Sequence, residues 1–272
     1  MAYILVTGAT SGIGRQTALQ LAALGHHVGV HGRSADKAQA VALEIERAGG
    51  QATAFLADLM SLENVSGLAA DVLDRWPRLD VLLNNAGLIQ SERRLTQDGH
   101  ESTWGINHLA HFLLTQLLLP RLNDSGGRVV CVASDAHYGV SVPFADLDGE
   151  GSYGGWKRYQ QSKLMNVLFA AELARRQNGV AVVSLHPGFV ASNFGMNAGW
   201  VRWMMRLTRL VQLSPDDGAA TSVFCATTPN IHTGGYYAKS REKAASKQGQ
   251  NEQDAKRLWE MSEARVAAWL FQ

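Results

Sequence analysis

The sequence predicts a doubly wound α/β fold, in which helices cover both faces of a parallel sheet. Short apolar strand candidates alternate with helical segments along the 272 residues, and the first strand candidate runs directly into a glycine-rich turn. With 46% hydrophobic residues the chain can bury a substantial core. No repeat or low-complexity linker marks a second domain, so we expect one domain over residues 1–272.

The expected elements follow from apolar runs and from the helical spacing of apolar residues. The strand candidates are Tyr3–Val6, His27–His31, Ala52–Leu56, Leu79–Leu83, Arg128–Val132 and Val180–Leu185, with a last strand near Tyr236-Tyr237. The helices are expected near residues 13–24, 35–48, 62–75, 98–121 and 156–177, with a C-terminal helix at about 251–270. The polar stretch Lys239–Gln250 is expected to be a surface loop.

A glycine turn follows the first strand candidate and opens the first helix. Glycine lets the backbone approach a pyrophosphate, and amides at a helix N-terminus face the phosphates. The glycine spacing differs from G-x-G-x-x-G, and the Lys-Ser/Thr of a P-loop is missing, which favours a dinucleotide over a nucleoside triphosphate. The alternative is a connection that binds nothing. The residues expected to contact the cofactor here are Gly8, Ser11, Gly12, Ile13 and Gly14.

Tyr159 and Lys163 are four residues apart in a segment expected to be helical, so their side chains share one face. An ammonium beside a phenol favours the phenolate and moves the tyrosine pKa down from its usual value of about 10. Such a pair can act as a general acid or base. The spacing alone is weak evidence, because many Tyr and Lys residues share a helix surface by chance.

Further motifs occur in a fixed order along the chain, namely Asp58, Asn84-Asn85-Ala86-Gly87, Asn107, Ser134 and Pro187-Gly188. With the glycine turn and the Tyr–Lys pair, this order resembles the short-chain dehydrogenase/reductase superfamily over nearly the whole chain. Ile106-Asn107-His108-Leu109, Ser134-Asp135-Ala136-His137, the long gap before Tyr159 and Ser214-Pro215 look most like its retinol dehydrogenase-like branch. The resemblance implies a Rossmann-type fold and hydride transfer between nicotinamide and a carbonyl or alcohol.

The resemblance also implies catalytic roles for Asn107, Ser134, Tyr159 and Lys163. Ser134 would stabilise charge on the substrate oxygen, and Tyr159 would supply the proton. Lys163 would lower the tyrosine pKa and hold the nicotinamide ribose, while Asn107 would kink its helix and hold a water that feeds protons to the lysine. Without the Tyr–Lys pair, Ser134 would be interpreted as a strand-end turn residue and Asn107 as a polar residue on an apolar helix.

Other positions would hold the rest of the cofactor. Asp58 is placed to bind the adenine amino group, with Leu59 as a backbone contact, although Asp58 could instead cap the helix that follows. Asn85, Ala86 and Gly87 follow the fourth strand candidate, at the sheet edge where ligands of such folds bind. By resemblance, the nicotinamide carboxamide would be held by Pro187, Gly188, Val190 and Ser192.

The end of the second strand candidate bears on cofactor choice. An NAD enzyme would carry an acid there to bind the ribose 2′-hydroxyl. This chain has Gly32 and then Arg33, whose guanidinium suits a 2′-phosphate, so NADP(H) is preferred over NAD(H). The alternative is that Arg33 is a solvent-exposed loop charge.

Residues of about 189–214 are expected to form a substrate lid. Its apolar members are Phe194, Met196, Trp200, Trp203, Met204, Met205 and Leu207. A Met-rich, aromatic surface suits a small lipophilic aldehyde, ketone or alcohol, although these residues could instead pack on the core. The lid could also contact a membrane, because Arg202, Arg206 and Arg209 flank it.

Ser134 and Tyr159 are 25 residues apart, a longer gap than is common in the superfamily. Residues Asp135–Gly155 are therefore expected to form a surface excursion near the site mouth, within which His137 could contact substrate. The excursion could also obstruct the helix pairing by which many relatives associate. A monomer and a homodimer both remain open.

Composition excludes several classes of protein. A net charge of +1 without a long basic run argues against nucleic acid binding. Cys131 and Cys225 are expected to be separate buried thiols, which fits a reducing compartment. The apolar stretch Leu109–Leu119 is too short to span a bilayer, and a strand from residue 3 leaves no room for a signal peptide, so a cytoplasmic protein is expected. His108 and His111 lack a nearby third ligand, so no metal site is expected.

The expected function is an NADP(H)-dependent oxidoreductase, working in the carbonyl reductase direction because NADPH usually drives reduction. One alternative is reduction of a ring double bond, which would use the same Tyr–Lys pair. Another is a non-catalytic NADP(H)-sensing protein of the same fold. The intact Ser134, Tyr159 and Lys163 argue against a sensor, because a binding module needs no proton relay.

Overall fold

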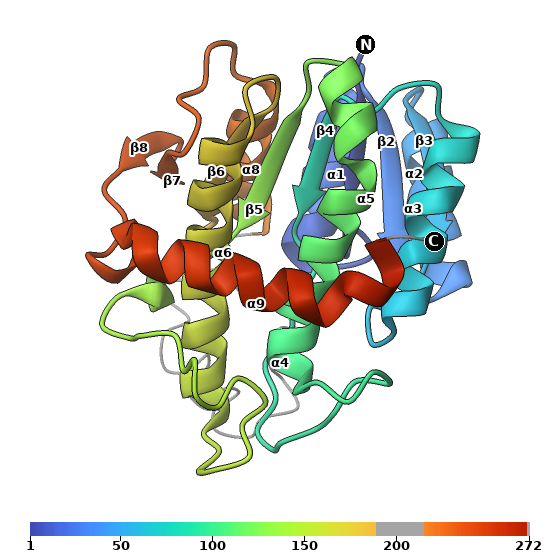
Figure 1. The fold of residues 1–272 in the computed structure, drawn as a ribbon. Helices are drawn as coiled ribbons and strands as arrows, with labels where there is room; N and C mark the ends of the chain where they lie inside the picture. The colour runs from blue at the N-terminus through green and yellow to red at the C-terminus, as the bar shows by residue number, and fades with distance from the viewer. Residues whose placement is uncertain (189–214, 271–272) are drawn as a thin grey trace, which may run out of the picture.

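The computed structural model describes residues 1–188 and 215–270, and a central sheet organises them (Figure 1). In this part of the chain eight strands lie in the order β3-β2-β1-β4-β5-β6-β7-β8. Neighbouring strands from β3 to β7 are parallel, and β8 pairs antiparallel with β7. The strands are β1 (Tyr3–Val6), β2 (His27–Gly32), β3 (Gln51–Leu56), β4 (Val81–Asn84), β5 (Arg128–Val132), β6 (Ala181–His186), β7 (Tyr236–Ala238) and β8 (Arg241–Lys243).

Helices cover both faces of this sheet. They are α1 (Gly12–Ala23), α2 (Ala35–Arg47), α3 (Leu62–Arg75), α4 (Ser102–Trp104), α5 (Ala110–Asp124), α6 (Gly155–Arg176), α8 (Pro215–Thr227) and α9 (Glu252–Leu270). Short turns complete the set: the π-helical turn η1 (Gly105–Leu109) and the 3-10 turns η2 (Asp135–His137) and η3 (Gln248–Gln250). Helices α1, α2 and α8 contribute to the core on one face and α3, α5 and α6 to the core on the other. The predicted doubly wound α/β fold is confirmed.

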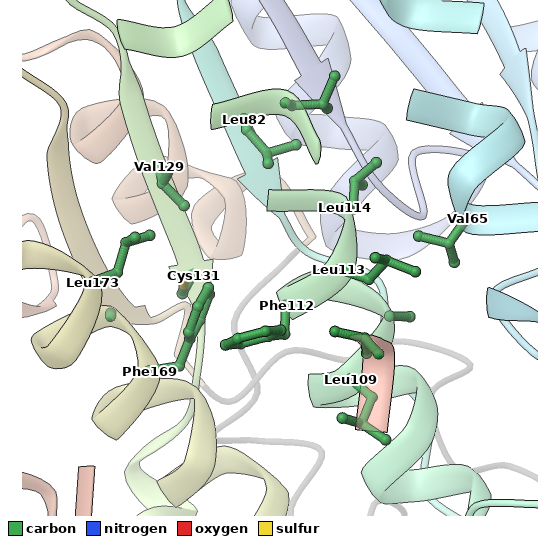
Figure 2. Packing of buried hydrophobic residues seen from close by; sticks show 14 of the residues in the cluster. Val65, Leu82, Leu109, Phe112, Leu113, Leu114, Val129, Cys131, Phe169 and Leu173 are labelled. Carbon is green, nitrogen blue, oxygen red and sulfur yellow. The ribbon is translucent and has the colours of Figure 1, made fainter. Parts of the chain in front are cut away.

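The core has two halves because side chains alternate across each strand. Ile4 and Val6 of β1 pack on one face of the sheet, whereas Leu5 packs on the other. Figure 2 shows part of the core that contains Leu5, where Phe112 of α5 and Phe169 of α6 pack against each other beside Cys131 of β5. Strands that are buried on both faces appear in the sequence as continuous apolar runs, which is why they could be predicted.

Helix α9 lies across α5 and α6 (Figure 1). The Trp259 ring packs edge-on against Phe112 at a centroid distance of 4.9 Å, and the Arg176 guanidinium lies 4.4 Å from the Trp259 ring centroid. Helix α9 therefore covers part of the outer surface of the α5 and α6 pair.

Two expected elements differ from the structure. The single helix expected near 98–121 is instead α4, a π-helical turn and α5, and the first of these begins at Ser102. The buried carboxylate of Glu101 fixes that start by accepting the amides of Thr103 and Trp104. The stretch expected to be a surface loop, Lys239–Gln250, contains β8 and η3. Strand β8 consists of three exposed charged residues, so it lacks the apolar alternation that predicts a strand.

Candidate active site

The glycine turn between β1 and α1 has the geometry of a nucleotide-binding turn. Gly8 and Gly12 have φ of 66° and 54°, the left-handed region that glycine adopts without strain. A Cβ atom on Gly14 would overlap the carbonyl oxygen of Gly8 and the Asn85 amide. Backbone conformation thus requires glycine at positions 8 and 12, and close packing requires it at position 14. Without side chains at these positions, a phosphate can approach the backbone of the turn.

Residues after β4 brace this turn. The amide group of Asn85 donates to the carbonyl of Thr7 at 2.7 Å, and the main-chain amides of Asn85 and Ala86 both donate to the Thr7 hydroxyl at 2.9 Å. The Asn85 side chain therefore engages the glycine turn itself. Gly87 follows within the site, because a Cβ atom there would lie 3.6 Å from the ammonium nitrogen of Lys163.

His31 at the end of β2 also holds the glycine turn, a contact that the sequence analysis missed. Its Nδ1 accepts the Gly8 amide at 3.2 Å and its Nε2 donates to the Ala57 carbonyl, also at 3.2 Å. Because one partner can only donate and the other can only accept, the ring is neutral. Burial lowers the pKa of His31 to about 4.

Asn107 lies within the π-helical turn, which is the irregularity that the resemblance implies at this residue. Its Oδ1 accepts the Leu88 amide at 2.8 Å, while its Nδ2 donates to the Leu88 carbonyl and to the Ser162 hydroxyl, each at 2.9 Å. Ser162 in turn donates to the carbonyl of Tyr159 at 2.8 Å. Asn107 thereby ties the segment after β4 to the turn of α6 that carries Tyr159.

Ser134, Tyr159 and Lys163 meet beyond the carboxyl end of β5. The Ser134 hydroxyl caps η2 by accepting the Ala136 amide at 3.1 Å, and it shares a hydrogen bond with the phenol of Tyr159. The Lys163 ammonium lies 5.6 Å from the centre of the Tyr159 ring and donates to the Val132 carbonyl at 2.9 Å. The structure thus brings together the three residues that the sequence places 25 and four positions apart.

The expected lowering of the tyrosine pKa by Lys163 is absent. Burial raises the pKa of Tyr159 to about 12, and the hydrogen bond with Ser134 offsets only part of that rise. The lysine ammonium instead donates to the Val132 carbonyl. Burial also lowers the pKa of Lys163 to about 8, so this lysine can gain or lose a proton near neutral pH.

His137 supports the serine loop and does not point to a substrate site, which corrects the sequence-based expectation. The ring is fully buried, its Nδ1 donates to the Ser134 carbonyl at 2.6 Å, and its Nε2 accepts the Ser246 amide at 3.0 Å. The neighbouring Asp135 carboxylate accepts the Tyr236 hydroxyl at 2.8 Å and the Lys243 ammonium at 3.0 Å. The β7–β8 hairpin and the segment after it therefore fix the loop that begins at Ser134.

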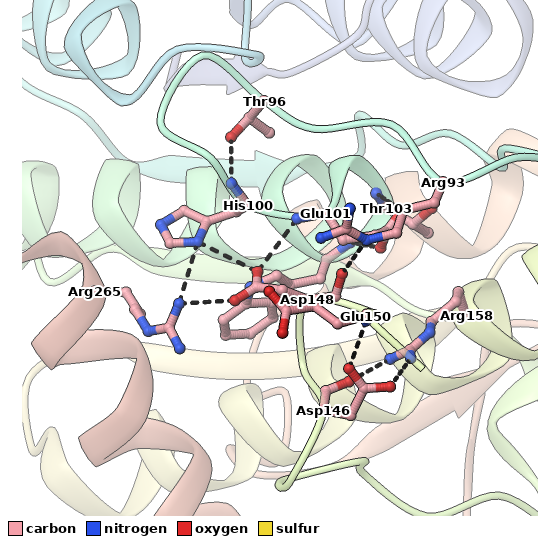
Figure 3. A network of polar contacts seen from close by, with 11 residues as sticks. Arg93, Thr96, His100, Glu101, Thr103, Asp146, Asp148, Glu150, Arg158 and Arg265 are labelled. Atoms are coloured by element: carbon pink, nitrogen blue, oxygen red, sulfur yellow. Dashed lines mark hydrogen bonds and ion pairs between the residues drawn. The ribbon is translucent and has the colours of Figure 1, made fainter. Parts of the chain in front are cut away.

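The predicted excursion between Ser134 and Tyr159 is pinned by charged groups (Figure 3). Asp146 accepts a hydrogen bond of 2.8 Å from Arg158, the residue directly before Tyr159. Asp148 accepts Arg265 of α9 at 2.9 Å and lies 3.4 Å from the His100 ring nitrogen. Burial alone would raise the pKa of Asp148, but its hydrogen bonds with His100 and Arg265 and from the Glu101 amide bring it to about 2.

The surface beside the glycine turn carries positive charge. Arg33 is exposed directly after β2, and a Cβ atom on Gly32 would overlap the Thr10 side chain, so an acidic residue there would displace Thr10. A pocket of about 390 Å³ is lined by Thr10, Ser11, Arg15, Lys37, Ala40, Val41 and Glu44. Arg15 donates to Glu44 at 2.5 Å. The narrow turn and the cations beside it fit a phosphorylated dinucleotide.

Asp58 does not cap the following helix, which removes that alternative. The cap of α3 is Ser61, whose hydroxyl accepts the Asn64 amide at 3.3 Å. The Asp58 carboxylate accepts the nearby Met60 amide at 3.1 Å and is partly exposed. Leu59, beside it, is buried.

Comparisons with known proteins settle the family. The family model described as short chain dehydrogenase matches residues 2–200. The chain belongs to the short-chain dehydrogenase family. Retinol dehydrogenase 11 of Mus musculus is 38% identical over 265 residues, which cover 95% of this chain and 84% of that protein. The chain is thus a member of the retinol dehydrogenase-like branch, and it is an oxidoreductase of a family that binds nicotinamide cofactors.

A bacterial relative and two solved structures agree with this placement. A Streptomyces sp. (strain C5) protein provisionally named daunorubicin C-13 ketoreductase DnrU is 39% identical over 97% of this chain and 92% of its own. An uncharacterized protein from Mycobacterium Paratuberculosis has a TM-score of 0.82 at 32% identity, covering 98% of this chain and 94% of that one. A short chain dehydrogenase from Burkholderia cenocepacia J2315, solved in complex with NADP, has a TM-score of 0.70 at 28% identity, covering 86% of this chain and 94% of that one.

Several expected site residues of this short-chain dehydrogenase lie outside the described residues. They are the residues of the expected lid, 189–214, which include the expected cofactor contacts Val190 and Ser192. Pro187 and Gly188 follow β6, and Gly188 has a φ of 97°.

A residue that the sequence analysis overlooked is Trp156. Its side chain is 40% exposed, and its ring centroid lies 5.5 Å from that of Tyr159. Its position three residues before Tyr159 on a helix is the sequence signal that could have identified it. An exposed indole at this place can contact an apolar substrate.

The remaining expectations concern metals, thiols and membranes. His108 bonds to Ser262 at 2.9 Å, whereas His111 contacts Thr7, and the described residues contain no group of three or more potential metal ligands. Cys131 and Cys225 are free and buried, as predicted. Within the described ranges, no helix combines the length and the apolar character needed to cross a bilayer.

Proposed function

We propose that this short-chain dehydrogenase transfers hydride between NADP(H) and a small lipophilic aldehyde or ketone, or the corresponding alcohol. The observation that carries the proposal is the group of Ser134, Tyr159 and Lys163 beyond the carboxyl end of β5, in which the lysine is buried and the serine and tyrosine are partly exposed. Ligands of doubly wound sheets bind at that edge. The narrow glycine turn lies at the same edge, beyond β1.

The nicotinamide, when bound, supplies the hydride, and the chain supplies the proton. With its pKa raised to about 12, Tyr159 stays a protonated phenol at neutral pH, which is the form that donates a proton to a carbonyl oxygen. Ser134 donates a hydrogen bond to the same oxygen and stabilises the charge that develops there. Lys163, with a pKa of about 8, holds the nicotinamide ribose and returns a proton to the site. These protonation states support the reductive direction.

The proposed cofactor contacts follow the sheet edge. Amides of the glycine turn would hold the pyrophosphate, Asp58 and Leu59 would hold the adenine, and the segment after β4 would contact the adenosine. The remaining proposed contacts are Pro187, Gly188, Val190 and Ser192 at the nicotinamide carboxamide. Asn107 acts by holding Ser162 and the Tyr159 backbone.

Preference for NADP(H) over NAD(H) is supported by charge. Arg33 is exposed beside the turn and makes no hydrogen bond or ion pair with the residues that the structure describes. Lys37 lines the adjoining pocket, where a second cation would add to the attraction for a 2′-phosphate. The Burkholderia relative bound to NADP supports the same choice.

A lipophilic substrate is supported by the relatives named for retinol and for a ketone of daunorubicin, and by the exposed Trp156 beside Tyr159. The apolar composition of 189–214 points the same way. We further propose that the protein works in the cytoplasm. We propose a monomer or a homodimer, since α9 already covers part of the α5 and α6 surface.

The test is oxidation of NADPH and NADH by the purified protein, followed at the nicotinamide absorbance, with aliphatic, aromatic and isoprenoid aldehydes and ketones. We expect turnover of apolar carbonyls that is faster with NADPH at subsaturating cofactor. Tight NADPH binding without turnover of any carbonyl would favour the NADP(H)-sensing alternative. Turnover of a ring double bond instead would overturn the substrate class.

A further inference from the structure

His111 lies in the first turn of α5 and is 2% exposed, and both of its ring nitrogens have polar partners. Its Nδ1 lies 3.2 Å from the carbonyl oxygen of Asn107, and its Nε2 lies 3.0 Å from the hydroxyl oxygen of Thr7. Thr7 and His111 are 104 positions apart in the sequence. The ring therefore joins the glycine turn to the π-helical turn that holds the proposed catalytic asparagine.

The direction of both hydrogen bonds follows from the partners. A carbonyl oxygen can only accept, so the Nδ1 of His111 carries the proton. The Thr7 hydroxyl already accepts two amides, from Asn85 and Ala86, and its own proton is left to donate. Its nearest acceptor is the His111 Nε2 at 3.0 Å, since the Leu83 carbonyl is 3.4 Å away. The ring is thus neutral and protonated only at Nδ1.

The backbone of His111 is fixed as well. The Thr115 hydroxyl donates to the His111 carbonyl at 2.6 Å, and the Asn84 amide group donates to the Thr115 hydroxyl at 2.9 Å. This chain of bonds fastens the start of α5 to the end of β4. The imidazole has little freedom to leave its two partners, so it can hold Thr7 and Asn107 at a fixed separation.

We infer that His111 is a positioning residue of the active site, which holds the glycine turn in register with Asn107 and, through Asn107 and Ser162, with Tyr159. The inference rests on the proposed function, because one end of this bridge lies at the turn proposed to bind the pyrophosphate and the other leads to the residues proposed to act at the nicotinamide. The π-helical turn shifts the hydrogen-bond register of the helix, and the His111 side chain supplies a donor to the Asn107 carbonyl from within the chain.

Loss of the ring would leave polar groups unpaired at both ends. Asn107 and Thr7 are both fully buried, so a lost partner there is costly. We expect His111→Leu to weaken NADPH binding by about tenfold and to lower kcat by at least about tenfold. His111→Gln, whose amide can donate and accept, should recover most of both losses.

The matched control is His108→Phe, on the same helical segment. His108 is also a buried ring, but it stacks on Trp104 and its Nε2 bonds to the Ser262 hydroxyl of α9, not to the glycine turn. This variant should lower the melting temperature while leaving the NADPH dissociation constant and kcat unchanged. If His111→Leu behaves as His108→Phe does, His111 is a packing residue only and the inference fails.

A double-mutant cycle tests the link to Thr7. Thr7→Val removes the partner of the ring, so adding His111→Leu to it should change NADPH affinity by less than about twofold. An undiminished loss in the Thr7→Val background would overturn the link.

A readout that needs no turnover separates this inference from the proposed function. Nitrogen-15 NMR of the imidazole in the unliganded protein should show the neutral ring of His111 protonated at Nδ1. A ring protonated at Nε2, or a charged ring at neutral pH, would overturn the inference even in an active enzyme. Absence of NADPH turnover in the wild type would count against the proposed function and leave this measurement decisive for His111.

Discussion

The ammonium of Lys163 donates a hydrogen bond of 2.9 Å to the carbonyl of Val132, the last residue of β5. The Asn166 amide donates to the same oxygen at 3.3 Å. The bond holds the lysine at the strand end from which Ser134 also projects. Burying this cation costs stability, because burial disfavours the charged form and lowers the pKa of Lys163 from 10.5 to about 8.

Lys163→Met should therefore give a more stable but inactive protein. At pH 7 the wild type carries the full cost of the buried charge, up to about 3 kcal/mol, part of which its bond to Val132 offsets. We expect kcat/KM to fall by at least about a hundredfold and the melting temperature to rise. Thermal unfolding and turnover of the same sample check both.

The pH dependence provides a control for this interpretation. The folded pKa of Lys163 lies below the unfolded value, so the folded state binds fewer protons between pH 8 and 10.5. Wild-type stability should gain on that of Lys163→Met as the pH rises through this window. Parallel stability curves for the two proteins would show that Lys163 is not desolvated as described.

His31→Gln should flatten the acid side of the stability curve. Burial lowers the pKa of His31 from 6.5 to about 4, so its neutral form stabilises the fold fully above pH 6.5 and this contribution is lost as the pH falls toward 4. One such group contributes a slope of about 1.4 kcal/mol per pH unit in that window. Urea unfolding between pH 4.5 and 6.5 should show a shallower slope for the variant, whose amide can keep both hydrogen bonds. An unchanged slope would mean that His31 titrates normally in the folded protein.

Arg33→Asp should reverse the cofactor preference. The substitution replaces the proposed partner of the 2′-phosphate with a group that repels phosphate and can accept a ribose hydroxyl. NADPH affinity should fall by about tenfold to a hundredfold, with little loss of NADH affinity. Equal losses for both cofactors, measured as dissociation constants, would contradict the assignment of Arg33. Lys37→Gln should produce a smaller shift in the same direction.

Asp148→Asn should loosen the excursion between Ser134 and Tyr159. It weakens the bonds to Arg265 and His100 that fasten the excursion to α9 and to the segment before α4, at a cost of about 2 kcal/mol. Limited proteolysis should then cut within 139–152 more quickly than in the wild type. Asp71→Asn, which breaks the exposed ion pair with Arg75, is the matched control and should cost less than about 0.5 kcal/mol. Equal cleavage rates in all three proteins would show that the pinning contacts are dispensable.

Residue patterning was sufficient to predict most of the fold, whereas the proposed catalytic group was implied by the resemblance to the superfamily. The central parallel strands β1, β4 and β5 are largely buried apolar runs, and the order of the strands in the chain fixes the edge at which Ser134, Tyr159 and Lys163 meet. The turn after β1 was predictable from its glycines for a physical reason, because Gly8 and Gly12 adopt φ values that other residues avoid.

Contacts between distant buried polar groups were not predictable. His31, His111 and His137 each join two backbone or hydroxyl groups across the site, and nothing in their local sequence shows which partners they meet. The prediction of a lowered pKa for Tyr159 was wrong for a related reason. Helical spacing places Lys163 on the same helix face as Tyr159, but it cannot show that the ammonium bonds to the Val132 carbonyl.

The central claim is that Tyr159 is the proton donor of an NADP(H)-dependent oxidoreductase, and Tyr159→Phe tests it most directly. NADPH binding, followed by the fluorescence of the reduced nicotinamide, and steady-state turnover of a lipophilic aldehyde should be measured on the same preparations of wild type and variant. We predict a dissociation constant within about twofold of the wild type and a kcat lowered by at least about a thousandfold. A variant that binds NADPH and turns over at a rate comparable to the wild type would contradict the account.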